Sequence, residues 1–180
     1  MKTYLTYGFA MALAGALLTL ALFFMGYHND PAKLQTAQRI GMVVGIAIGF
    51  VGISLGTRAR RAETPESEPF GYGRALGAGV MVALFSCLLG FVTNYVYMAF
   101  INPGFGDIIL QAQAADLEAK GMSSAQIEQA EKVTRFFISP LISSAFSMIF
   151  GFIFSVIIAL ITSAFLKRSD SGKVPPVQAA

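Results

Sequence analysis

The sequence predicts an all-α integral membrane protein: a four-helix bundle with an extracytoplasmic amphipathic helical hairpin between its third and fourth spans. Composition is the first indication, because 55% of the 180 residues are hydrophobic and only 13% are charged, whereas soluble domains carry about 25% charged residues. The second is the grouping of apolar residues into four long runs without any Asp, Glu, Lys, Arg or His: Tyr4–Tyr27, Ile40–Gly56, Ala75–Ile101 and Pro140–Leu166.

Each run is close to, or longer than, the roughly 20 residues that a helix needs to cross the hydrocarbon of a bilayer. The second run is the shortest, and its helix must extend toward earlier residues or lie in a locally thinned bilayer. We therefore predict one transmembrane domain at residues 1–168 and a flexible cytoplasmic tail at 169–180. The predicted spans lie at about residues 4–27, 38–57, 75–101 and 140–166, with the outer hairpin at 104–139.

The first run is predicted to remain as a span rather than to be cleaved as a signal peptide. Its apolar core is longer than the 7–15 residues of a typical h-region, and its end, LFFMG at residues 22–26, lacks a small-residue cleavage site.

Basic residues predict the orientation, since Lys and Arg are enriched in cytoplasmic loops. Eight of them fall on the side of the termini and the loop at residues 57–74, and five on the other side. This places both termini in the cytoplasm. The ends of the second and fourth spans carry the residues that we expect to anchor the protein at anionic lipid headgroups: Arg58, Arg60, Arg61, Lys167 and Arg168.

Small residues form ridges on two of the spans. Glycine costs up to about 1 kcal/mol in a soluble helix, but in a membrane it lets another helix approach closely. The second span carries such a glycine zipper at Gly41, Gly45, Gly49, Gly52 and Gly56. The fourth span carries small residues at every fourth position, at Ser143, Ser147, Gly151, Ser155, Ala159 and Ser163. We predict that both ridges pack helices, either together within the monomer or against a partner.

Local signals set the ends of several helices. Asp30 followed by Pro31 is a typical helix start. In the polar region at residues 104–139, Gly121 is expected to end one short helix. Ser123 and Gln126 form a capping box that begins a second one. The hairpin is expected to lie on the outer membrane surface or to cover the mouth of the bundle.

Residues suited to catalysis are scarce. His28 is the only histidine and has no companion with metal-ligand spacing, and Cys87 is the only cysteine. None of the four apolar runs contains Asp, Glu, Lys, Arg or His, whereas an enzyme or proton-coupled pump would be expected to carry such a group within the membrane. We expect no catalytic, cofactor-binding or metal-binding residue, no nucleic-acid partner, and identify no small-molecule ligand. Asn94 in the third span is expected to bond to another helix, or alternatively to line a polar vestibule.

Three short segments carry a family resemblance: FGYGRA at residues 70–75, KGMSSAQIE at 120–128 and FLKR at 165–168. With the four-span layout, the chain resembles the bacterial membrane proteins grouped as domain of unknown function 4199. The resemblance covers nearly the whole chain and implies a bacterial inner-membrane protein of about this size. That family brings no established activity, so it implies no site residues.

The leading functional hypothesis is a non-enzymatic inner-membrane protein that acts through helix association with a second copy of itself or with another membrane protein. It is based on the small-residue ridges and the scarcity of chemical groups. The alternative is a small transporter or channel subunit that works as an oligomer, since four helices without interior charges leave little room for a polar path. A membrane enzyme is the class that the residues favour least.

Overall fold

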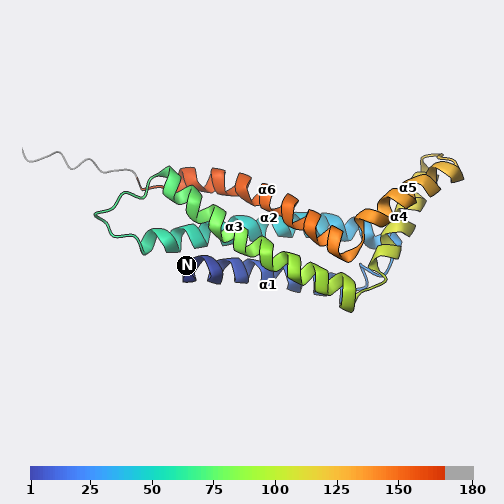
Figure 1. The fold of residues 1–180 in the computed structure, drawn as a ribbon, viewed down its shortest axis with the longest axis horizontal. Coiled ribbons are helices and arrows are strands. Elements are labelled where there is room, and N and C mark those ends of the chain that lie inside the picture. Colours follow the sequence, from blue (N-terminus) through green and yellow to red (C-terminus); the bar gives the residue numbers. More distant parts are fainter. Residues whose placement is uncertain (169–180) are drawn as a thin grey trace, which may run out of the picture.

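Four long helices run beside one another in the computed structural model, which describes residues 1–168 (Figure 1). They are α1 (Lys2–Phe24), α2 (Pro31–Ala62), α3 (Tyr72–Val96) and α6 (Pro140–Leu166). A five-residue π-helix, η1 (Tyr97–Ile101), continues α3. The shorter helices α4 (Phe105–Ala119) and α5 (Ser124–Phe137) extend from one end of the bundle. Among the described residues the fold is all-helical, as predicted, while the predicted tail at 169–180 lies outside them.

All four long helices have the length and composition of membrane spans, with α3 and η1 forming a single candidate at Tyr72–Ile101. The helix α2 is much longer than its apolar run: its 32 residues correspond to about 48 Å at 1.5 Å per residue. It is therefore longer than the roughly 30 Å of hydrocarbon, and it begins at Pro31, well before the apolar run, as the extension toward earlier residues predicted. The protein is thus a membrane protein with four candidate spans.

The helix ends follow the local sequence signals. The carboxylate of Asp30 accepts a hydrogen bond from the backbone N–H of Ala32 at 3.0 Å, and Pro31 is the first residue of α2. Both hydrogen bonds of the predicted capping box between Ser123 and Gln126 are present. Gly121 has a φ of 75°, a left-handed conformation that favours glycine and allows the chain to turn between α4 and α5.

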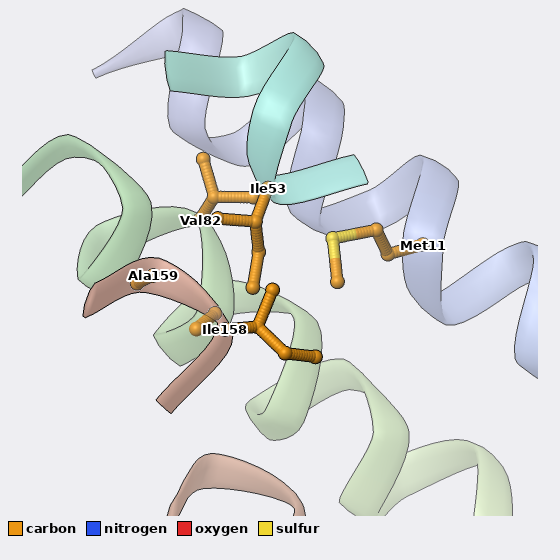
Figure 2. Close-up of a cluster of buried hydrophobic side chains, with 6 residues drawn as sticks. Met11, Ile53, Val82, Ile158 and Ala159 are labelled. Atoms are coloured by element: carbon orange, nitrogen blue, oxygen red, sulfur yellow. The ribbon is translucent and has the colours of Figure 1, made fainter. Parts of the chain in front are cut away.

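The core lies where the four long helices meet. Figure 2 shows Met11 of α1, Ile53 of α2, Val82 of α3, and Ile158 and Ala159 of α6 gathered around one point. Ile53, Val82 and Ala159 have no exposed surface. The most extensive helix contacts are those of α3 with α6 and with α1, so α3 is the central element of the bundle.

Many large apolar side chains are exposed on the outside of the bundle. Phe9, Leu17 and Phe154 leave more than half of their surface exposed, the opposite of what a water-soluble helix does with large apolar side chains. This surface is suited to contact with lipid chains.

Candidate functional site

The predicted glycine ridge of α2 has two halves with different environments. Gly49, Gly52 and Gly56 are buried. A Cβ atom placed on Gly49 would lie 2.9 Å from Cδ1 of Ile158, and one on Gly52 would overlap the side chain of Met11. By contrast, Cβ atoms placed on Gly41 and Gly45 would meet nothing within 4 Å. Only the C-terminal half of the ridge is therefore used for packing inside the monomer.

The small residues of α6 make their described contacts mainly with α3. Ala159 is buried, and a Cβ atom placed on Gly79 of α3 would lie 3.0 Å from its Cβ. Ser163 is also buried, Ser143, Gly151 and Ser155 are half-buried, and Ser147 is exposed. Beside Gly49, α6 contributes Ile158, which is not one of the small residues of its ridge. The ridge residue Ala159 faces Gly79 of α3.

A hydrogen bond inside the span region links α3 and α6. The amide of Asn94 donates to the hydroxyl of Ser144 at 3.0 Å, and Ser144 donates in turn to the backbone carbonyl of Pro140 at 2.7 Å. Ser144 has no exposed surface. The interhelical hydrogen bond expected of Asn94 is thus present.

At the end of the bundle opposite the hairpin, Arg168 fastens the loop between α2 and α3. Its backbone N–H donates to the carbonyl of Phe70 at 2.8 Å. Its guanidinium donates to the carbonyls of Pro65 and Glu68 at 2.9 and 2.7 Å. Phe70 is almost completely buried. One predicted lipid anchor is therefore engaged within the chain.

Two further predicted lipid anchors also have partners inside the protein. Arg61 donates to the carbonyl of Leu166 at 3.4 Å, and Arg60 forms an ion pair with Glu63 at 3.0 Å. A hydrogen bond from Thr3 is the largest cause that lowers the pKa of Glu63, and a hydrogen bond from Arg60 is the next. The side chains of the remaining anchors, Arg58 and Lys167, are exposed.

A pocket of about 200 Å³ lies at this loop. Its two arginines are both paired with carboxylates, Arg60 with Glu63 and Arg74 with Glu68, at 3.0 and 2.7 Å. The pocket is smaller than the 300–1,000 Å³ typical of ligand sites, and its cations are already neutralised. The lining residues are Tyr4, Arg60, Glu63, Thr64, Pro65, Glu68, Phe70 and Arg74.

A polar cluster that the sequence did not predict is buried at the end of the bundle where α4 and α5 extend. Nδ1 of His28 lies 2.6 Å from the hydroxyl oxygen of Tyr97, which also accepts a hydrogen bond from the amide of Asn102 at 3.0 Å. Each of the three residues is less than a tenth exposed. The spacing of Tyr97 and Asn102 comes from η1, whose π-type turn brings the N–H of Asn102 to the carbonyl of Tyr97 at 2.7 Å.

The hydrogen bonds of this cluster suit a neutral His28. The Tyr97 hydroxyl can donate its hydrogen to Nδ1 of one tautomer or accept the Nδ1 hydrogen of the other, while it accepts from Asn102 in both cases. Burial lowers the pKa of His28 from its ordinary value, which also favours the neutral form.

The cluster joins the hairpin to the bundle. The ring of Phe105, the first residue of α4, lies 4.8 Å from that of His28 and 5.7 Å from that of Tyr97 between centroids. Because His28 and Tyr97 are 69 residues apart, no local pattern in the sequence pairs them. Among residues 1–168, no group of three or more His, Cys, Asp or Glu residues is arranged to hold a metal ion.

A family model described as "Protein of unknown function (DUF4199)" matches residues 6–168. The chain belongs to this family. The match extends from α1 to Arg168 and includes the four candidate spans, the hairpin and both polar ends of the bundle. The family resemblance of the three short segments is thereby confirmed. No curated protein and no solved structure shows significant similarity to the chain.

Proposed function

We propose that this member of the family is a non-enzymatic, multi-pass protein of a bacterial inner membrane, and that it acts by associating with other transmembrane helices. The surface proposed for association is the N-terminal half of the α2 ridge. The observation that carries the proposal is the open space beside Gly41 and Gly45. The other glycines of the ridge are in contact with side chains of neighbouring helices.

The surroundings of these two glycines support this role. Between Gly41 and Ile48, every residue of α2 is exposed or half-buried, and Met42 and Val43 expose more than 60% of their surface. Gly41 and Gly45 are four residues apart, the spacing at which two small residues form one flat face for a neighbouring helix. The partner is a second copy of the chain or another membrane protein.

The proposed orientation places both termini and the loop fastened by Arg168 in the cytoplasm, and the hairpin outside it. It is supported by the excess of basic residues on the side of the termini. In this orientation Arg58 and Lys167, whose side chains are exposed, lie at the anionic inner leaflet.

The association proposal is tested by replacing Gly41 and Gly45 together with isoleucine. We expect this change to release the partner or dissociate the oligomer, as measured by crosslinking in native membranes and by mass in mild detergent. Bulky side chains at these positions hold the facing helix away, but they meet nothing within the monomer. The fold is therefore expected to survive.

A matched control replaces Gly77 and Gly90 of α3 with isoleucine, because these glycines also have open space around them. The control is expected to keep the associated state of the native protein. If the Gly41/Gly45 variant is folded and keeps the same mass and the same crosslinked partners, the association proposal is wrong.

A further inference from the structure

We propose that α5 is an interfacial membrane helix, and that its apolar face inserts among the lipids at the hairpin end of the bundle. This apolar face consists of Val133, Phe136 and Phe137. The proposal does not depend on the association of α2, because it concerns another helix and another surface.

All three side chains are exposed on the surface of the described structure. Val133, Phe136 and Phe137 are 57%, 61% and 43% exposed, whereas Ile127 on another side of the same helix is buried. The helix α5 contacts α4 and the start of α6. Phe137 is at the edge of the packed side, where it meets Phe146 of α6, and the rest of the apolar face stays exposed in the described structure.

Aromatic contacts connect the apolar face to the surface of a membrane span. Phe137 lies 5.4 Å from Phe136 and 5.2 Å from Phe146 between ring centroids, and Phe146 stacks on Phe150 at 6.1 Å. Phe146 and Phe150 belong to α6, a candidate span, and are 41% and 56% exposed. The row of rings therefore runs without a break from a lipid-facing surface onto α5.

This continuity identifies the occupant as lipid. Rings at the level of the headgroups bury their apolar bodies in the membrane, and an amphipathic helix lies with its apolar side about 5–10 Å into the boundary between headgroups and acyl chains. Since Phe146 lies on a span and contacts Phe137 directly, the apolar face begins at the membrane depth where α6 enters the bilayer.

The polar side of α5 agrees with this placement. Lys132 pairs with Glu128 at 2.8 Å, and Arg135 lies 3.9 Å from Glu131 and 4.0 Å from Asp107 of α4. At 100° per residue, Arg135 is about 200° around the helix from Val133. Glu131 and Arg135 thus lie opposite Val133, and Lys132 lies at the border of the apolar face, about 40° from Phe136. A long basic side chain at this border can extend to the headgroups, as in helices that lie in a membrane surface.

Tryptophan fluorescence provides a direct test, because the native chain contains no tryptophan. Phe136→Trp and Val133→Trp place one reporter each on the apolar face, and Arg135→Trp places one on the polar side at nearly the same height. Each variant is reconstituted as the full chain in phosphatidylcholine vesicles, with and without bromine on the acyl chains near the headgroup.

The two reporters on the apolar face are expected to emit at shorter wavelength and to lose at least about half of their emission in brominated vesicles, because they lie within reach of the upper acyl chains. The Arg135→Trp reporter is expected to keep its emission in brominated vesicles and to be quenched by iodide in the surrounding water. Circular dichroism and elution from a sizing column verify the fold, and either apolar-face reporter suffices if the other variant does not fold.

Two outcomes overturn the proposal. Equal quenching of all three reporters by iodide, without an effect of bromine, means that α5 lies in water. Protection of the apolar-face reporters from both quenchers means that a protein, such as a second copy of the chain, covers them.

Discussion

Gly8 of α1 is the clearest position at which a missing side chain permits the packing of two helices. A Cβ atom at this position would lie 2.7 Å from Cβ of Phe85 and 3.0 Å from the backbone nitrogen of Ser86. Neither atom can move without shifting α3, so the two helices would have to separate. Without water inside the membrane, such close contacts are a main source of attraction between helices.

We therefore expect Gly8→Ala to destabilise the bundle by about 1–3 kcal/mol, the usual cost of overpacking. The measurement is unfolding by heat or by denaturing detergent. Gly15→Ala is the matched control on the same helix, because its Cβ would meet nothing within 4 Å. Equal stability of the Gly8 and Gly15 variants would show that α1 and α3 are not in close contact at Gly8.

For single residues, the sequence predicts the capping of helix ends but not the contacts between residues that are distant in the sequence. The roles of Asp30, Gly121 and Ser123 could be predicted because a cap depends on residues within one turn of the helix. The partners of His28 could not, because Tyr97 meets it only through the packing of the α1–α2 connection against η1. The sequence feature that could have indicated a buried polar contact was an isolated histidine at the end of an apolar run.

At the scale of elements, the connection between α2 and α3 shows how a charged residue acquires a further role once the chain is folded. The sequence predicts that Arg168 meets lipid headgroups, as basic residues at span ends commonly do. In the structure its guanidinium also donates to two carbonyls of the loop, about 100 residues earlier in the chain. The end of α6 thereby holds the start of α3.

Arg168→Lys separates the two roles, because it keeps the positive charge but loses the forked donor geometry of the guanidinium. We expect the backbone amides of residues 63–71 to exchange hydrogen about tenfold faster in this variant, since hydrogen bonds from a charged donor contribute roughly 1.5 kcal/mol or more. Hydrogen–deuterium exchange in nanodiscs measures this. Unchanged exchange in the loop would mean that only the charge of Arg168 matters.

For the whole molecule, length and hydropathy were sufficient to predict four long helices, but not which helices adjoin. The two small-residue ridges were candidates for direct packing against each other. In the structure α3 is the shared neighbour, and α6 places Ala159 against Gly79 instead. A small-residue pattern indicates that a face can be approached closely, but it does not specify the helix that approaches it.

The orientation of the whole molecule is tested with reporter fusions. A fusion at the C-terminus is expected to be active only with a cytoplasmic reporter, and one inserted at Gly121 only with an exported reporter, because basic residues stay on the cytoplasmic side. A C-terminal fusion that is active only with the exported reporter would contradict the orientation predicted from the basic residues.

The sequence alone determined that this chain is an all-helical membrane protein, where several of its helices begin, and that its four apolar runs contain no Asp, Glu, Lys, Arg or His. These properties depend on composition and on neighbours within a few residues. Only the tertiary structure decided which glycines pack against another helix, which arginines form hydrogen bonds within the chain, and that His28 and Tyr97 share a hydrogen bond. These contacts join residues that are far apart in the sequence: 41 positions for Gly52 and Met11, 69 for His28 and Tyr97, and 103 for Arg168 and Pro65. Helical periodicity defines the faces of a helix but not their partners.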